Sequence, residues 1–252
     1  HVGVKIVTVF PGNAARGAAT VQGAYLLLSG ETGAPLALID GPRLTLWRTA
    51  AASALAADYL ARPDARHLVM AGAGALAAHL VAAHAAQRPI ERVSIWARRR
   101  DRAEALAARL DRPGLAVAAV HDLDAAVAEA DIVSAATLAA APLIHGDRLR
   151  SGTHVDLVGG FTPAMREADD AAVRRARVYV DTLAGALAEA GDIVQPIAAG
   201  VLDRDAIAGD LFALARGEAV GRRSADEITL FKSVGTALED LAAAIAVWRQ
   251  TG

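Results

Sequence analysis

The chain has 252 residues, of which 54% are hydrophobic and 21% charged, with no cysteine and a formal net charge of -2 at pH 7. This composition excludes a disordered chain, a disulfide-stabilised scaffold and a metal site built from thiolates. The balanced charge argues against a nucleic-acid-binding protein. We therefore expect a globular protein of one large domain or two small ones, with no nucleic-acid partner and no metal.

Two segments bear on the location of the chain. Residues 68–87 carry no formal charge, but their glycines and histidines favour a strand followed by a helix over a membrane span. The chain begins at His1, inside a segment that is typical of a strand, with no initiator methionine and no signal-peptide pattern. We expect a missing N-terminal piece, a cytoplasmic location and no membrane partner.

The first sixty residues begin with strand patterns and end with a helical pattern. Residues 2–9 predict a strand, and residues 21–29 and 35–39 predict a hairpin around the turn at 30–33. An alanine-rich helix is expected to follow over 43–61. This part of the chain therefore predicts antiparallel β-structure followed by a helix.

The middle of the chain alternates between short apolar runs and helical patterns. Such alternation predicts an α/β fold, a doubly wound parallel sheet with helices on both faces, over residue 64 to about 180. We expect strands at 67–71, 91–96, 115–120, 131–136, 153–158 and 177–180, and helices at 75–87, 100–110 and 122–129.

The C-terminal segment has apolar residues at alternating spacings of three and four. This spacing predicts one continuous helix that packs against the β-rich first segment. The residues of this seam are Phe231, Val234, Leu238, Leu241, Ile245 and Trp248.

The segment from Gly72 to Ala77 reads G-x-G-x-x-A, directly after an apolar strand and at the start of a helix. Gly72 would permit the tight turn, Gly74 would let a pyrophosphate approach the backbone, and Ala77 would let helix and strand pack closely. The phosphates would then contact free amides at the positive end of the helix. We predict dinucleotide binding; the alternative is a glycine-rich turn required by packing alone.

The end of the second strand bears on the choice of dinucleotide. An acidic residue there would bind the ribose hydroxyls of NAD, but the sequence reads Trp96-Ala97-Arg98-Arg99-Arg100. Arginines suit the 2′-phosphate of NADP through charge-assisted hydrogen bonds. We predict that NADP(H) is preferred and that NAD(H) is possible; the alternative is a solvated run of arginines.

Few other polar residues stand out. Lys5 and Lys232 are the only lysines, and Lys5 lies in mid-strand, where its side chain points either to solvent or into a cleft. Arg48 lies in the alanine-rich helix, where arginine is usually a surface residue. Two acidic pairs, Asp169–Asp170 and Glu239–Asp240, are interpreted as solvated helix charges.

Five motifs follow one another in order along almost the whole chain. Their combination resembles the ornithine cyclodeaminase/mu-crystallin family, and it is more specific than any one of them. The motifs are Gly3–Thr8 (GVKIVT), Thr20–Gly23 (TVQG), Leu46–Ser53 (LWRTAAAS), Gly72–Gly74 (GAG) and Asp226–Gly235 (DEITLFKSVG).

This resemblance implies a fold of two domains. A Rossmann-type nucleotide-binding domain, residues 63–184, is expected to be inserted into an α+β substrate-binding and dimerisation domain, residues 1–62 and 185–252. A homodimer is expected, because the strands of the first segment would otherwise expose an edge.

The resemblance also implies roles for individual residues. Lys5 resembles the catalytic and substrate-contacting lysine of the family, and Arg48 the arginine that holds the substrate carboxylate or the cofactor phosphate. Val234 is expected to face the substrate. The remaining residues are expected to lie on the cofactor side: Thr20, Thr49, Gly72, Gly74, Ala75, Leu76, Ala97, Arg98, Arg99, Thr137, Val158, Gly159 and Ser233.

One departure from the family affects the expected reaction. Cyclodeaminating members have an aspartate after the Val-Gly-Gly turn, and Phe161 stands at that position here. A phenyl ring transfers no proton, and the Gly-Gly-Phe-Thr-Pro stretch looks most like reductases of cyclic imines. We therefore expect reduction of a small cyclic α-imino acid, pyrroline-2-carboxylate or piperideine-2-carboxylate, by NAD(P)H.

Three alternatives stay open from the sequence. The first is an ornithine cyclodeaminase that uses NAD+ and releases ammonia. The second is an amino-acid dehydrogenase on the same scaffold. The third is a nucleotide-binding structural protein without turnover, as lens crystallins of this resemblance can be.

Overall fold

A computed structural model describes residues 1–17 and 21–251 of the chain. It divides into two compact units, each with its own interior. Unit 1 consists of His1–Thr49 and Thr236–Gly252, and unit 2 consists of Ala50–Gly235. Unit 2 is thus an insertion in the sequence of unit 1.

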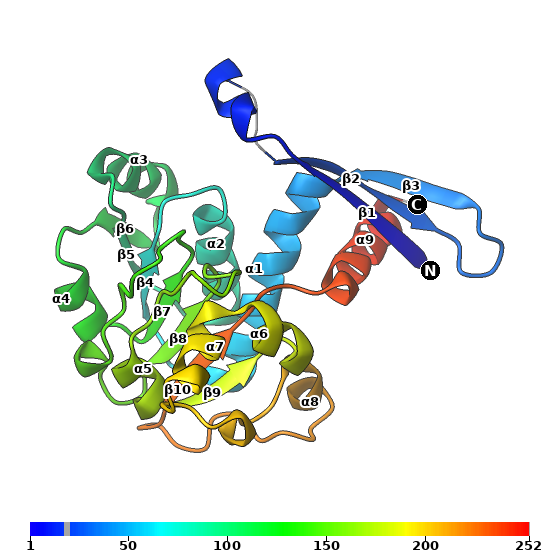
Figure 1. Cartoon of the computed structure of the whole chain (residues 1–252). Coiled ribbons are helices and arrows are strands. Elements are labelled where there is room, and N and C mark those ends of the chain that lie inside the picture. Colours follow the sequence, from blue (N-terminus) through cyan, green and yellow to red (C-terminus); the bar gives the residue numbers. More distant parts are fainter. Residues whose placement is uncertain (18–20, 252) are drawn as a thin grey trace. The chain divides into compact units, whose positions relative to one another are not determined.

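Unit 1 is a three-stranded antiparallel sheet covered by one helix (Figure 1). The predicted hairpin forms, and the first strand pairs with it so that Lys5 lies opposite Tyr25. The C-terminal helix packs against all three strands, with Tyr25, Leu27 and Ala244 in the shared interior. Its elements are β1 (Val2–Val9), the 3-10 helix η1 (Pro11–Arg16), β2 (Val21–Leu28), β3 (Pro35–Asp40), the beginning of α1 (Gly41–Leu60) and α9 (Ala237–Thr251).

Unit 2 is built on a seven-stranded parallel sheet in the order β6-β5-β4-β7-β8-β10-β9. The predicted parallel α/β class and the separate antiparallel part are therefore confirmed. The strands are β4 (His67–Ala71), β5 (Arg92–Trp96), β6 (Ala116–Ala119), β7 (Ile132–Ala135), β8 (His154–Leu157), β9 (Ala176–Val180) and β10 (Ile228–Lys232).

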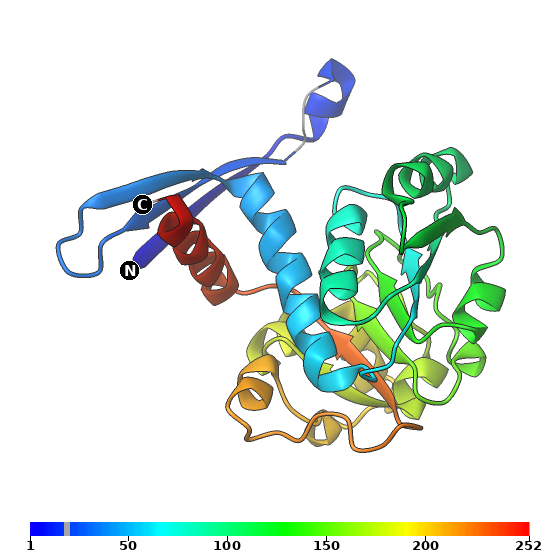
Figure 2. The same ribbon diagram turned by 180° about the vertical axis from the view of Figure 1, so that it is seen from behind.

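Helices cover both faces of this sheet, and Figure 2 shows α1 and α2 on one of them. The alternation of side chains along β4 explains the two layers: Leu68 and Met70 pack with α1, α2 and α3, whereas Val69 and Ala71 pack with α4 to α7. The helices of unit 2 other than α1 are α2 (Ala77–Gln87), α3 (Arg100–Leu110), α4 (Leu123–Ala128), η2 (Gly146–Arg148), α5 (Asp170–Arg175), α6 (Leu183–Glu189), α7 (Gly191–Ala198), η3 (Arg204–Ala206) and α8 (Leu211–Ala215).

The strand order places a topological switch point between β4 and β7. From β4 the chain moves outward to β5 and β6, and from β7 it moves the other way, to β8. Ligands of open α/β sheets bind outside the carboxyl ends of the strands at such a point. A ligand site is therefore expected beside the segments that follow Ala71 and Ala135.

The predicted helical seam is wrong at its beginning. Phe231 is not on a helix; it lies in β10, fully buried between β8 and β9. The run Ile228-Thr-Leu-Phe is β-branched and aromatic, and a strand buried on both faces shows no alternation that would separate it from a helix. The later part of the seam, from Leu238, does form α9.

The unit boundaries also differ from the expected ones near residues 62 and 185. Unit 2 begins at Ala50 because the second part of α1 packs on the parallel sheet through Ala50 and Ala57. It ends at Gly235 because β10 is an inner strand of the same sheet.

Within the described ranges, no helix has the length and hydropathy needed to cross a membrane.

Candidate active site

The turn after β4 has the conformation that its glycines predict. Gly72 has φ +119°, and a Cβ there would lie 2.6 Å from the carbonyl oxygen of Ala136. A Cβ on Gly74 would instead meet open space. Ala77 is buried, as close packing of helix against strand requires. Gly72 therefore serves the fold, whereas Gly74 leaves room on the solvent side.

The helix that follows this turn begins with unused hydrogen-bond donors. The amides of Gly74, Ala75 and Leu76 donate to no acceptor in the described part of the chain. The first intrahelical bonds run from Ala77 and Leu80 back to Gly74 and Leu76. Free amides and the positive end of the helix dipole together favour an anion such as a pyrophosphate.

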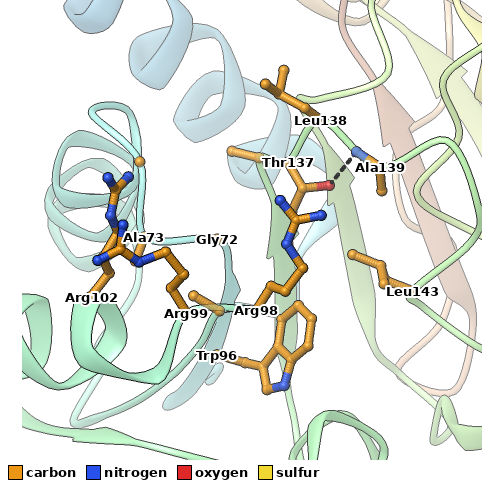
Figure 3. Close-up of a pocket in the computed structure, with 13 residues that line it drawn as sticks. Gly72, Ala73, Trp96, Arg98, Arg99, Arg102, Thr137, Leu138, Ala139 and Leu143 are labelled. Atoms are coloured by element: carbon orange, nitrogen blue, oxygen red, sulfur yellow. Dashed lines mark hydrogen bonds between the residues drawn. The ribbon is translucent and has the colours of Figure 1, made fainter. Parts of the chain in front are cut away.

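A cavity of about 310 Å³ lies at the switch point (Figure 3). It is formed by the turns that follow β4, β5 and β7, so it stands where the topology predicts a ligand. The residues that line it are Gly72, Ala73, Gly74, Trp96, Ala97, Arg98, Arg99, Arg102, Ala136, Thr137, Leu138, Ala139 and Leu143.

Three arginines give this cavity a positive wall. In Figure 3, Arg99 and Arg102 extend towards the Gly72–Ala73 turn, and Arg98 extends towards Thr137. Arg99 is paired with Asp101, with its Nη2 2.6 Å from Oδ2. Neither Arg98 nor Arg102 forms an ion pair with any described residue. Two guanidinium groups are therefore uncommitted beside the cavity.

Thr137 is fixed by a carboxylate behind the cavity wall. Its amide and its Oγ1 both donate to Oε1 of Glu167, over 2.7 and 2.8 Å. Oγ1 also accepts from the amide of Ala139, the bond dashed in Figure 3. Glu167 was not found by sequence reasoning, because it lies thirty positions from Thr137 outside any motif.

The other predicted cofactor-side residues of unit 2 follow neighbouring strands at the same edge of the sheet. Val158 and Gly159 come directly after β8, and Ser233 and Val234 after β10. Asp181 holds the second pair in place, because its Oδ2 accepts from the amides of Val234 and Gly235. None of these residues lines the cavity itself.

Lys5 and Arg48 meet in unit 1 at one carboxylate. Nζ of Lys5 lies 2.9 Å from Oδ1 of Asp240, and Nε of Arg48 lies 3.3 Å from the same oxygen. Nη1 of Arg48 is also 2.9 Å from Oε2 of Glu239. Lys5 thus points to the α9 side of the sheet, with its side chain 21% exposed.

The interpretation of Glu239 and Asp240 as solvated charges is wrong. Asp240 is buried, and both acids face the two cations rather than water. They come at the start of α9, where the helix dipole favours negative charge. Their acidity was visible in the sequence, but their pairing depends on long-range packing of α9 on β1.

The remaining predicted residues are placed as follows. Thr49 is buried in α1, one residue after Arg48. Thr20 lies outside the described residues. The structure therefore brings Gly72, Gly74, Ala97, Arg98, Arg99 and Thr137 together at one cavity, and Lys5 and Arg48 together at one acidic pair.

A second polar constellation has the composition of a nucleophilic triad. His84 Nε2 lies 3.1 Å from Asp156 Oδ2, which also accepts from Ser134 Oγ over 2.7 Å, while Ser53 donates to Oδ1 over 2.9 Å. All four side chains are completely buried, so no substrate reaches them. Burial lowers the pKa of the adjacent His154 to about 3, so that histidine stays neutral. This network stabilises the interior of unit 2.

Phe161, the position that the resemblance compares with the acid of cyclodeaminating members, follows Gly160 after β8 and is 49% exposed.

Among the described residues, no cluster of three histidine, aspartate or glutamate side chains is suited to a metal ion.

Comparisons with known proteins find similarity over almost the whole chain. The ornithine cyclodeaminase/mu-crystallin family matches residues 1–251. A Delta(1)-pyrroline-2-carboxylate reductase of Paracoccus denitrificans is 51% identical over 240 residues, which are 95% of this chain and 76% of the relative. Protein SAR DEFICIENT 4 of Arabidopsis thaliana is 42% identical, over 96% of this chain and 75% of that protein.

Solved structures are also similar over 98% of the chain, among them two with bound ligands. One is a Delta(1)-pyrroline-2-carboxylate reductase of Thermococcus litoralis in complex with NADH and L-proline, with 36% identity, a TM-score of 0.93 and 77% of that chain covered. The other is an archaeal alanine dehydrogenase dimer with bound NAD, with 30% identity, a TM-score of 0.91 and 76% covered. The chain therefore belongs to the ornithine cyclodeaminase/mu-crystallin family.

Proposed function

We propose that this protein is an NAD(P)H-dependent reductase of small cyclic α-imino acids, which converts pyrroline-2-carboxylate or piperideine-2-carboxylate into proline or pipecolate. The observation that carries the proposal is the likeness to the Thermococcus litoralis reductase in complex with NADH and L-proline. The Paracoccus denitrificans reductase, at 51% identity, supports the same reaction.

The dinucleotide would be held by unit 2. The open position at Gly74 and the free amides of Ala75 and Leu76 suit its pyrophosphate. Ala97, Thr137, Val158, Gly159 and Ser233 would form the rest of its site, with Thr20 and Thr49 from the first segment. When bound, the nicotinamide supplies the hydride that reduces the C=N bond.

We propose that NADPH is preferred over NADH. Arg98 and Arg102 are uncommitted beside the cavity, where the 2′-phosphate would need charge-assisted donors. Arg99 would add to the positive field although it is paired with Asp101.

The substrate would be bound by the cations of unit 1. Nη1 of Arg48 pairs with Glu239 and Nε pairs with Asp240. The remaining nitrogen, Nη2, would donate to a substrate carboxylate. Lys5 would pair with that carboxylate, or donate a proton through water to the ring nitrogen, and would be the catalytic residue. Val234 would contact the apolar ring of the substrate.

Cyclodeamination is the alternative reaction on this scaffold. A lysine cyclodeaminase that recognises L-lysine, L-ornithine and L-2,4-diamino butyric acid is 31% identical, with a TM-score of 0.82. Phe161 disfavours this reaction, because the phenyl ring has no proton to transfer at the position of the acid. Reduction needs no acid there.

We also propose that the protein is a homodimer in which unit 1 carries the interface. One face of β1 exposes Val2, Val4 and Ile6 at alternate positions, each at least 45% exposed. The alanine dehydrogenase neighbour is a dimer, and a second copy would bury this apolar face. Sedimentation should give a dimer for the protein and a monomer for Ile6→Glu. A monomeric wild type would contradict this proposal.

A spectrophotometric assay tests the reaction. We expect NADPH and NADH to be oxidised in the presence of pyrroline-2-carboxylate or piperideine-2-carboxylate, faster than with open-chain imino acids. Lys5→Ala should abolish turnover while dinucleotide binding persists. Turnover that survives in Lys5→Ala would remove Lys5 from the mechanism. Ammonia release from ornithine with NAD+ alone would decide for the lyase.

A further inference from the structure

Three ionisable side chains lie completely buried beneath the carboxyl edge of the parallel sheet. Lys232 is the last residue of β10, Asp192 lies in the first turn of α7, and Glu167 lies in the segment before α5. Nζ of Lys232 is 3.3 Å from Oδ2 of Asp192. Oδ1 of Asp192 accepts from the amides of Glu167 and Ala168 over 2.7 and 3.0 Å.

A buried charge cluster of this kind needs a reason other than stability. Removing charges from water costs several kcal/mol per ion, and apolar residues of similar volume often stabilise a fold as well or better. A strand buried on both faces is normally apolar throughout. Nevertheless β10 ends in one of the two lysines of the chain.

Glu167 controls the hydrogen bonding of Thr137, which lines the cavity. Oε1 of Glu167 accepts from both the amide and the hydroxyl of Thr137, so the hydroxyl hydrogen is committed to the protein. The oxygen of that hydroxyl can then only accept from a ligand. Glu167 thus makes Thr137 an acceptor, which suits a ribose hydroxyl.

Lys232 and Asp192 control the turn that follows β8. Nζ of Lys232 donates to the carbonyl oxygen of Gly159. A Cβ on Gly159 would collide with Oε1 of Glu167 and with the carbonyl oxygen of Thr137. Gly160 has φ +57°, and a Cβ there would lie 2.5 Å from Oδ2 of Asp192. The turn therefore rests directly on the charged groups.

We infer that Lys232, Asp192 and Glu167 are positioning residues that fix Thr137 and the Gly159–Gly160 turn for dinucleotide binding. None of the three lines the cavity, so each acts through a neighbour. The inference rests on the proposed function, because it takes a dinucleotide as the ligand of the cavity.

The charges of the cluster make this positioning dependent on pH. The pKa of Glu167 is raised to about 7, and burial is the largest cause. The charge of Asp192 raises this pKa further, whereas the charge of Lys232 and the hydrogen bonds from Thr137 lower it. Lys232 faces Glu167 from β10 and Asp192 faces it from α7. As pH falls through about 7, Glu167 gains a proton and its bonds to Thr137 lose their ionic character. We expect NADH binding to weaken over this range.

The affinity for NADH, measured by NADH fluorescence at pH values from about 6 to about 8, tests the inference without turnover. Glu167→Gln should make this affinity independent of pH. Lys232→Met should move the midpoint of the pH dependence to higher pH, because two buried carboxylates then face each other. Asp192→Asn should move the midpoint to lower pH. Loss of packing alone would not move two midpoints in opposite directions.

Two further variants keep the test decisive if a charge variant fails to fold. Thr137→Val should weaken NADH binding, and Thr137→Ser, which keeps the hydroxyl for Glu167, should restore it. Ser53→Ala is the matched control, because it removes a buried hydrogen bond to Asp156 away from the cavity. It should leave the midpoint unchanged.

The outcomes separate the two proposals. Folded charge variants that bind NADH with the wild-type affinity and midpoint would overturn the positioning role alone, and so would Thr137→Val with wild-type affinity. A wild type that binds neither NADH nor NADPH would overturn both. A wild type that binds NADH as described but reduces no imino acid would overturn only the reaction.

Discussion

Lys5 and Asp240 lie 235 positions apart in the sequence, and Nζ of the one is 2.9 Å from Oδ1 of the other. The same oxygen is 3.3 Å from Nε of Arg48. One carboxylate on α9 therefore orients both cations that we propose to bind the substrate.

Replacement of this carboxylate should impair turnover while leaving the fold intact. With Asp240→Asn, Lys5 and Arg48 lose their shared partner, and we expect kcat/KM for the imino acid to fall by roughly ten- to a hundredfold. NADH affinity should not change. Steady-state kinetics and NADH titration measure both, with Asp205→Asn as an exposed control. Wild-type kcat/KM in Asp240→Asn would show that the pairing does not serve the substrate.

The arginines of the cavity should decide between the two dinucleotides. Arg98→Ala and Arg102→Ala each remove a donor for the 2′-phosphate, so NADPH binding should weaken by about ten- to a hundredfold. NADH binding should stay nearly constant. Arg100→Ala is the control, because Arg100 is exposed and paired with Glu104. Equal losses for NADH and NADPH would contradict a phosphate-specific role.

The two glycines of the turn after β4 should separate stability from binding. Gly72→Ala forces a Cβ into a conformation with φ +119° and against the Ala136 carbonyl, and should cost about 1–3 kcal/mol of unfolding free energy. Gly74→Ala meets open space, so stability should hold. Dinucleotide binding should nevertheless weaken on the order of tenfold, because the Cβ occupies room for the pyrophosphate. Urea unfolding and NADH titration distinguish the two effects.

Asp131 should make the protein sensitive to acid. Burial alone would raise the pKa of this carboxyl, but hydrogen bonds from the amides of Arg66 and His67, and the charges of Arg150 and Arg62, together hold it below its usual value. A carboxyl with a lowered pKa in the folded state stabilises the fold above its unfolded pKa, near 3.9, and this contribution disappears as pH falls further.

Asp131→Asn should therefore lower the unfolding free energy at pH 7 by on the order of 2–3 kcal/mol. The difference from wild type should shrink below about pH 4. Urea denaturation at several pH values measures it. Asp64→Asn, in which the replaced side chain is 72% exposed, should change stability by less than about 0.5 kcal/mol. A pH-independent difference between Asp131→Asn and wild type would refute the ionic origin of the effect.

Local signals in the sequence predict the parallel sheet and the dinucleotide turn. The effects of Gly72 and Gly74 depend on the backbone at their own positions, and the strand before them is apolar throughout. Residues that are adjacent in the sequence are therefore enough to predict this turn. The hairpin from Val21 to Asp40 is local in the same way. The resemblance adds Lys5 and Arg48, which composition alone leaves undecided.

The missed features all depend on pairing across long distances in the sequence. Phe231 fits a helical spacing by coincidence, and only its place between β8 and β9 makes it a strand residue. In the sequence Asp240 looks like a surface acid, and only the packing of α9 on β1 pairs it with Lys5. Glu167 and Lys232 contact Thr137 and Gly159, which follow other strands at the same edge of the sheet.

The insertion of unit 2 in the sequence of unit 1 has a consequence for biosynthesis. The ribosome makes β1, β2 and β3 first and α9 only after all of unit 2 has emerged. Until then the nascent hairpin carries Tyr25 and Leu27 without the helix that covers them. We expect the inserted unit to mature first, and the three-stranded sheet of unit 1 to depend on a chaperone or on rapid elongation during that interval.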